Sequence, residues 1–176
     1  MMDAATDLRP AKAETFLAGL QAGMIGALWM LFWMGLIAGW QRRSFWTPEN
    51  LMAGVFHPQR GIRVDFGAPT LSGLALYLTL YSLLGSGFAL LCGGRRMRPP
   101  RLTLLSLVFA LAWYYASFHL IWRSAAPAML LNASGSTLIG HVIYGIALGR
   151  FPTHFPSQYR PVAEIVAEPE SKIIAP

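Results

Sequence analysis

Residues 16–40 read FLAGLQAGMIGALWMLFWMGLIAGW, a stretch of 25 positions without a charged side chain. About 20 consecutive apolar residues allow a helix to cross the hydrocarbon core of a bilayer. The stretch is longer than the apolar core of a signal peptide, and acidic residues precede it at Asp3, Asp7 and Glu14. It therefore predicts a transmembrane helix that is retained in the mature protein.

The composition of the whole chain favours a membrane location. Hydrophobic residues make up 55% of the 176 positions, the mean hydropathy is +0.45, and only 12% of residues are charged, whereas a soluble domain carries about 25%. The net charge of +6 comes from basic residues that flank the apolar runs, as expected beside anionic lipid headgroups. No basic face is interleaved with aromatic residues, so nucleic acid is not an expected partner. The single cysteine, Cys92, excludes an internal disulfide framework.

Three further apolar segments follow, at 71–92, 102–122 and 127–149. Together with 16–40 they predict an all-α, polytopic membrane protein with a single four-helix transmembrane domain at 16–149. The fourth segment contains NASGST at 132–137, and such residues favour helix caps and turns. Either the helix passes through them with at most a mild break, which we favour, or a short entry segment precedes a helix that begins near Ser134.

The distribution of lysine and arginine predicts the orientation. With four spans, one side of the membrane holds the N-terminal segment 1–15, the loop 93–101 and the proline-rich tail 150–176. These segments contain nine of the fourteen basic residues. The other five lie on the opposite side. Because basic residues are retained on the cytoplasmic side, we expect both termini in the cytoplasm.

The connector after the first span, FWTPENLMAGVF at 45–56, has the pattern of a short helix. Thr47 and Pro48 are typical of a helix start, and the apolar spacing predicts a helix at 48–57 that lies in the membrane interface, with Glu49 and Asn50 turned to water. The residues expected at the interface are Trp46, Leu51, Met52, Val55 and Phe56. The favoured role is to brace the first hairpin, and the alternative is a lid or a docking surface for a partner.

Small and polar residues form stripes along the predicted spans, and such stripes let membrane helices approach closely. The second span offers Gly73, Tyr77, Tyr81 and Gly85, and His141 lies on the stripe of the fourth. We expect the stripes of spans two to four to face one another inside the bundle. The residues predicted to pack helices together are Gly19, Gly23, Ala27, Ser134, Thr137, Gly145 and Gly149.

Two sets of side chains are candidates for cofactor contact. Trp29, Trp33 and Trp40 fall on one face of the first span, where they could stack on a planar quinone or pigment, although lipid or helix packing is the favoured role. His119 and His141 are each candidates for a haem or chlorophyll contact. Their expected depths differ by at least about 6 Å, which disfavours a shared iron. No cofactor is predicted, and a bound lipid, quinone or pigment is the alternative.

The sequence argues against several activities. All eight acidic residues lie outside the predicted spans, whereas proton- and cation-coupled carriers usually place an ionisable residue within the membrane. The chain contains no HExxH pattern, glycine-rich phosphate loop or nucleophile elbow. We therefore expect no enzyme, no metal site and no ion coupling.

Three stretches together carry a resemblance: AGLQAGMIGA at 18–27, FWTPENLMA at 45–53 and GHVIYGIALG at 140–149. With these stretches the chain resembles small four-helix bacterial inner-membrane proteins of unknown function over residues 16–150. The resemblance implies a bacterial inner membrane and brings no activity with it.

The favoured functional hypothesis is a non-catalytic one. The protein would be an accessory or scaffolding subunit of a larger membrane complex, or a self-associating protein, that works through helix packing with other transmembrane helices and lipids. The alternative is a lipid-, quinone- or pigment-binding membrane protein. A small carrier for a neutral solute is the weakest hypothesis, because neither a pathway nor a coupling residue is visible in the sequence.

Overall fold

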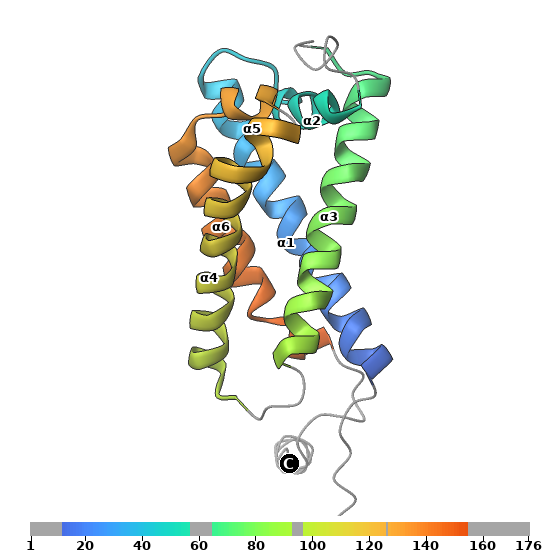
Figure 1. Ribbon diagram of the computed structural model, residues 1–176, viewed down its shortest axis with the longest axis vertical. Helices are drawn as coiled ribbons and strands as arrows, with labels where there is room; N and C mark the ends of the chain where they lie inside the picture. Colours follow the sequence, from blue (N-terminus) through green and yellow to red (C-terminus); the bar gives the residue numbers. More distant parts are fainter. Residues whose placement is uncertain (1–11, 57–64, 93–96, 126, 155–176) are drawn as a thin grey trace, which may run out of the picture.

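Long antiparallel helices dominate the computed structural model, which describes residues 12–56, 65–92, 97–125 and 127–154. All regular elements in these ranges are helical. The four main helices run along the long axis of the molecule (Figure 1): α1 (Lys12–Trp40), α3 (Ala68–Cys92), α4 (Pro99–Ala116) and α6 (Ser134–Leu148). Each runs opposite to the one before it, so Lys12 and the end of α6 lie at the same end of the bundle. The all-α prediction is confirmed.

Three of the helices are long and apolar enough to cross a membrane. They are α1, α3 and the continuous stretch Pro99–Ala125, in which α4 passes through a π-helical segment, η2 (Ser117–Ile121), into α5 (Trp122–Ala125). The fourth apolar helix, α6, has 15 residues and is about 22 Å long, short of a hydrocarbon core of about 30 Å. The described residues therefore contain three helices of spanning length and one shorter apolar helix.

The apolar segment 127–149 is broken at its polar residues. A 3-10 turn, η3 (Pro127–Leu131), comes first, and α6 begins at Ser134 after an extended Ala133. The Ala133 carbonyl accepts hydrogen bonds from the hydroxyls of Ser136 and Thr137, which fixes the start of the helix. The structure thus has the entry segment followed by a helix, and one unbroken helix over 127–149 is not formed.

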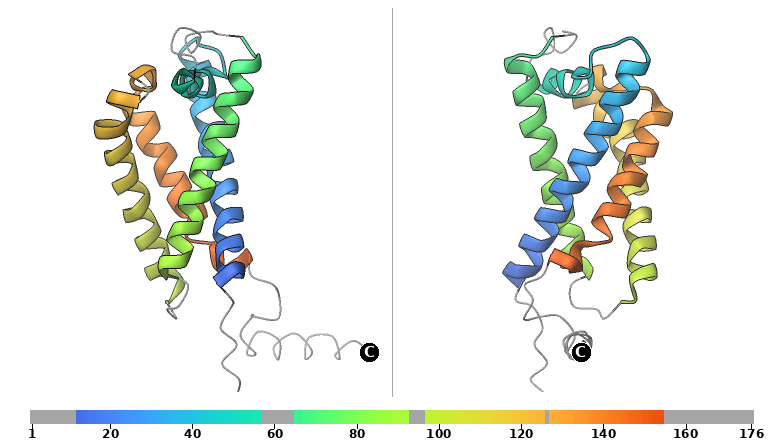
Figure 2. Two further views of the ribbon diagram at one scale, coloured as in Figure 1. Left: turned by 45° about the vertical axis from the view of Figure 1, so that its right-hand side comes forward. Right: turned by 180° about the vertical axis from the view of Figure 1, so that it is seen from behind.

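The connector helix α2 (Thr47–Met52) lies across the bundle axis at the end opposite Lys12 (Figures 1 and 2). It continues into η1 (Ala53–Val55) and packs against α3, α1 and η3. All six of its residues are buried, because these neighbours cover the side that would otherwise meet water. A helix begins at Thr47, close to the predicted start, but it is embedded in the bundle.

Part of the interfacial prediction is therefore wrong. Glu49 and Asn50, expected to face water, are only 2% and 1% exposed, while Phe56 is 55% exposed on the protein surface. Leu51 and Met52 are buried, as expected. The remaining two predicted interfacial residues, Trp46 and Val55, are half-buried.

Candidate functional site

The glycines predicted to pack helices together in the first span lie at a close crossing of α1 and α3. A Cβ on Gly19 would lie 2.6 Å from the carbonyl oxygen of Gly85, and one on Gly23 would lie 2.6 Å from that of Tyr81. Ala27 is fully buried further along the same helix. Only residues without a side chain fit at the two glycine positions, so the backbones of α1 and α3 are in contact there.

A second close contact joins α4 and α6. A Cβ on Gly145 would lie 3.0 Å from the Cα of Leu107, and one on Gly149 would lie 2.8 Å from the Ser106 hydroxyl. The Ser106 hydroxyl donates a hydrogen bond to the Gly145 carbonyl at 2.7 Å. Thr137 is buried, whereas Ser134 is exposed at the start of α6. The Ser134 carbonyl accepts a hydrogen bond from the Tyr114 hydroxyl of α4 at 3.3 Å, but its exposed side chain takes no part in the close contact between α4 and α6.

The three tryptophans predicted to form one aromatic stripe do not share one environment. Trp29 and Trp40 are 58% and 88% exposed, on an apolar surface that would face lipid. Trp33 is half-buried and donates from Nε1 to the Ser136 carbonyl at 3.1 Å. A single stacking platform for a quinone or pigment inside the protein is therefore not formed by these side chains.

The two candidate histidines also lie in different surroundings. His119 is half-buried in η2 and packs on Tyr115, with ring centroids 4.4 Å apart. His141 is 1% exposed in the middle of the bundle. Among the described residues, no three His, Cys, Asp or Glu side chains gather closely enough to hold a metal ion.

A cluster of polar aromatic side chains fills the centre of the bundle. The tyrosine–histidine cluster consists of Tyr77 and Tyr81 from α3 and His141 and Tyr144 from α6, and none of the four is more than 1% exposed. The rings of Tyr77 and Tyr81 stack at 4.6 Å because the two residues are one turn apart. Tyr144 packs edge-on against Tyr81 at 5.0 Å and donates to the Tyr81 carbonyl at 2.7 Å. Two helices are thus joined through buried, hydrogen-bonded rings.

The hydrogen bonds of His141 determine its tautomer. Nδ1 lies 2.8 Å from the Thr137 carbonyl, which can only accept, so Nδ1 carries a proton. In a neutral ring Nε2 is then an acceptor, and the Tyr81 hydroxyl donates to it at 2.9 Å. The Tyr81 hydroxyl and the imidazole are therefore joined by a buried hydrogen bond in which the hydroxyl is the donor.

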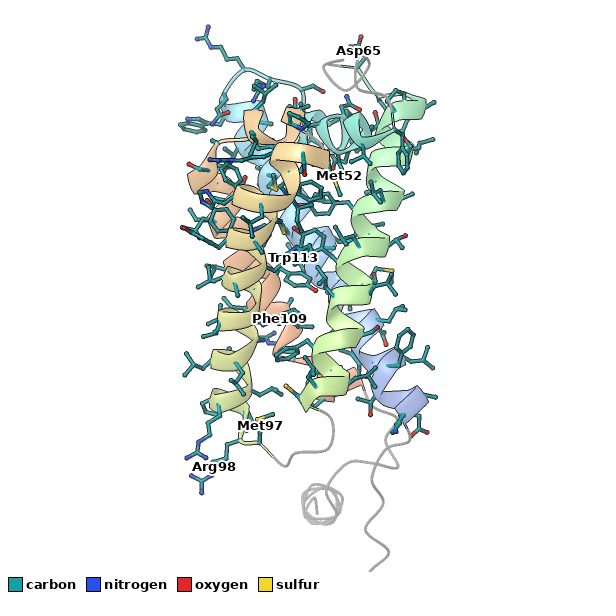
Figure 3. All side chains as sticks on the ribbon, in the orientation of Figure 1. Met52, Asp65, Met97, Arg98, Phe109 and Trp113 are labelled. Carbon is teal, nitrogen blue, oxygen red and sulfur yellow. The ribbon has the colours of Figure 1, made fainter. Side chains whose placement is uncertain are left out.

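Helix α1 and helix α4 close the space around the tyrosine–histidine cluster. The Tyr77 hydroxyl points to the sulfur atoms of Met30 and Met34 in α1, each at 3.7 Å. Trp113 projects from α4 toward the middle of the bundle (Figure 3), and its buried Nε1 has no hydrogen-bond partner among the described residues. Tyr114 of the same helix packs edge-on against His141, with ring centroids 5.3 Å apart. The cluster is therefore contacted by all four main helices.

Glu49 brings a carboxyl group to the outer side of this cluster. The backbone of α2 lies so close to α3 that a Cβ on Gly73 would collide with the Glu49 carbonyl oxygen. Asn50 fixes α2 from the next position, since its Oδ1 accepts from the Thr70 hydroxyl at 2.6 Å. Tyr77, one turn after Gly73, is within electrostatic reach of the Glu49 carboxylate.

The surroundings of Glu49 favour its protonated form. Its Oε2 is buried and has no hydrogen-bond partner among the described residues. Burial raises the pKa of Glu49 from 4.5 to about 7, against a smaller opposing effect of a hydrogen bond from its backbone. At neutral pH the side chain is therefore poised between its neutral and charged forms.

The sequence stripes pointed to part of this site and missed another part. Tyr77, Tyr81 and His141 were expected on inward-facing stripes, and the structure brings them together. Glu49 was missed because the connector was expected at the membrane surface, and Tyr144 because it lies one helical turn from His141 among apolar residues. The Pro48-Glu49-Asn50 run between aromatic and apolar neighbours was the available signal for a buried connector.

Comparison with known proteins gives no relative for this site. No family model, no curated protein and no solved structure matches the chain. The function is therefore argued from the geometry of the tyrosine–histidine cluster and Glu49.

Proposed function

We propose that this protein is a non-catalytic integral membrane protein that binds and releases a proton at Glu49. The observation that carries the proposal is the buried carboxyl group, 2% exposed, with an unpartnered Oε2 in the described part of the chain. Leaving a buried polar atom unpaired costs stability, and buried groups with strongly perturbed pKa values are commonly functional. Packing alone does not require a carboxyl group at this position.

The tyrosine–histidine cluster would connect the protonation state of Glu49 to the packing of the helices. An ionised Glu49 places a negative charge near Tyr77, which stacks on Tyr81, and Tyr81 in turn donates to His141. Protonation removes that charge and leaves a hydroxyl that can donate. The packing of α2 on α3, and the contact between α3 and α6, would then depend on pH.

Infrared difference spectroscopy tests this proposal directly. We expect the C=O stretch of a protonated carboxyl group, lost as pH rises with a midpoint near the Glu49 pKa of about 7, and absent in Glu49→Gln. Glu14→Gln is the matched control, because Glu14 lies in the first turn of α1, at the end of the bundle opposite Glu49. This variant should keep the band. A band that persists in Glu49→Gln, or that titrates near the ordinary glutamate value of 4.5, would reject the proposal.

The membrane and the topology belong to the same proposal. We infer a bacterial inner membrane, with α6 completing a fourth crossing and both termini in the cytoplasm. The inference is supported by the excess of basic residues on the side of the termini and by the alternating direction of the four main helices.

A second candidate is an accessory or scaffolding subunit, and the outer surface of α4 favours it. This surface is apolar beyond the first turn of the helix, and its large exposed residues are Leu104, Leu105, Val108, Leu111 and Tyr115. Lipid or another transmembrane helix would cover it. Val108→Cys in a Cys92→Ala background should crosslink to a partner or a second copy in membranes. A chain that stays monomeric and uncrosslinked would exclude this role.

A carrier for a neutral solute remains the weakest candidate. Glu49 supplies the coupling residue that the sequence did not show, but the middle of the described bundle is filled by the tyrosine–histidine cluster. The test is uptake of a labelled solute into vesicles, driven by a pH gradient. Uptake that is lost in Glu49→Gln would favour a carrier over the proton-binding protein and the accessory subunit.

A further inference from the structure

A groove lies on the outer surface between α1 and α6, apart from the tyrosine–histidine cluster. The two helices lie side by side when the bundle is seen from behind (Figure 2), and η4 (Phe151–His154) packs against α1 at its end. The groove has a volume of about 390 Å³, within the range of roughly 300–1,000 Å³ typical of small-ligand sites. It is lined by Ile25, Trp29, Ile143, Ile146, Ala147, Arg150, Thr153 and His154.

The lining changes from apolar to cationic along the bundle axis. Gly26 lies against Tyr144 and Ala147, which places Ile25 at the depth of Ala147 and Trp29 one turn further from the termini end. Arg150 follows Ile143 by seven positions, about 10 Å along the helix. The groove is therefore apolar toward the middle of the bundle and basic toward the end that holds Lys12.

The basic end offers the donors that a phosphate group needs. Arg150 is exposed, and a guanidinium matches the geometry of phosphate oxygens. The imidazole of His154 supplies a second donor at the same end. The Thr153 hydroxyl donates to the Arg150 carbonyl at 2.8 Å, which holds the turn of η4 beside the arginine.

We propose that this groove binds one anionic phospholipid from the leaflet on the Lys12 side. Its acyl chain lies along the aliphatic wall of α6 and the Trp29 ring, and its phosphate contacts Arg150 and His154. Three features select this occupant: the groove opens on a surface of exposed apolar side chains, its polar end is cationic, and that end lies where helix ends meet headgroups. The site shares only Trp29 with the predicted tryptophan stripe and does not depend on Glu49.

Lipid retention by the purified full-length protein tests the proposal. The protein is reconstituted with equal amounts of phosphatidylglycerol and phosphatidylcholine, extracted in mild detergent, passed through gel filtration, and analysed by native mass spectrometry. We expect phosphatidylglycerol to be retained over phosphatidylcholine by roughly fivefold, as one arginine contact would give. Arg150→Gln should lower its retention to the phosphatidylcholine level, and Arg123→Gln, exposed at the opposite end of the bundle, should not.

A second variant tests the apolar part of the groove. Ile146 is 43% exposed, so Ile146→Trp adds a ring to the groove with little change in the bundle interior, and retention of both lipids should fall. Equal retention of the two lipids by the wild-type protein, or unchanged phosphatidylglycerol retention in Arg150→Gln, would overturn the proposal. Glu49→Gln should retain lipid as the wild type does, so the outcome is independent of the proton-binding proposal.

Discussion

At the scale of single residues, the bundle combines a fully packed interior with one carboxyl group that packing does not explain. Each buried hydroxyl of the tyrosine–histidine cluster has a partner: Tyr81 donates to His141, Tyr144 to the Tyr81 carbonyl, and Tyr77 to two methionine sulfurs. Glu49 Oε2 is buried without one in the described chain. The free-energy cost of burying this oxygen depends on whether the carboxyl group is charged. The stability of the protein at different pH values therefore reports the protonation state of Glu49.

The first prediction follows from the raised pKa of Glu49. Below pH 4.5 the folded and unfolded states are both protonated there, so burial of a charge costs nothing. As pH rises toward the folded-state value of about 7, the unfolded state releases its proton first, and the folded state loses up to roughly 3 kcal/mol of stability. The Tm in detergent should fall between pH 5 and pH 8 for the wild type and stay flat for Glu49→Gln. Parallel profiles for the two proteins would contradict a buried titrating Glu49, and Glu14→Gln should keep the wild-type slope.

The second prediction concerns the hydroxyl of Tyr81. Tyr81→Phe keeps the ring packing but leaves Nε2 of His141 buried and unpaired, which should destabilise the protein by about 1–3 kcal/mol. Tyr115→Phe is the control, because Tyr115 is 65% exposed and surface changes typically stay within about 0.5 kcal/mol. Thermal unfolding of both variants at pH 6 gives the comparison. If Tyr81→Phe were as stable as Tyr115→Phe, the Tyr81–His141 bond would not be contributing to the fold.

At the scale of elements, sequence patterns predicted where helices lie along the chain better than they predicted what each helix packs against. The uncharged run at 16–40 is a local signal, so α1 could be located from it. The polar residues before Ser134 are a local signal as well, but the favoured prediction continued the fourth helix through them, whereas α6 begins at Ser134. The burial of α2 depends on residues far along the chain: Gly73 allows the close approach and Thr70 anchors Asn50. A helix start signal at Thr47 says nothing about these contacts, and an amphipathic spacing alone favoured the membrane surface. Glu49 was misplaced for the same reason.

The third prediction tests the close packing of α2 on α3 at Gly73. Gly73→Ala should place a methyl group against the Glu49 carbonyl and destabilise the protein by about 1–3 kcal/mol. Gly87→Ala on the same helix has open space around the added atom and should be neutral or slightly stabilising, because alanine favours a helix by about 0.5–1 kcal/mol. Met52→Cys in a Cys92→Ala background should react slowly with a thiol reagent. The reaction should be faster when Gly73→Ala is added. Equal labelling rates would show that α2 is not held by Gly73.

At the scale of the whole molecule, close contacts at glycines connect the main helices. Glycines join α1 to α3, α1 to α6 and α4 to α6, and the tyrosine–histidine cluster links α3 to α6 in the middle. The stripes on the predicted spans could indicate that small residues face the interior, but a stripe on one helix does not identify its partner. The pairing follows from the three-dimensional course of the chain, as does the exposure of Ser134. It leaves the outer surface of α4 among the uncovered apolar surfaces of the described molecule, and a partner helix or bulk lipid would pack there.

The last prediction concerns the orientation of this bundle in the membrane. Among the described residues, the end of the bundle with Lys12 also holds Arg98, Arg101 and Arg150, and Figure 3 places Arg98 at the opposite end from Asp65. The predicted topology assigns the segments 1–15, 93–101 and 150–176 to this side, which gives it nine lysines and arginines against five, so it should stay in the cytoplasm. A reporter that is active only in the cytoplasm should therefore be active at the C-terminus, and one inserted after residue 61 should be active only if it works in the periplasm. The reverse pattern would place Glu49 near the cytoplasmic side of the membrane, and a C-terminus opposite to Lys12 would show that α6 does not complete a fourth crossing.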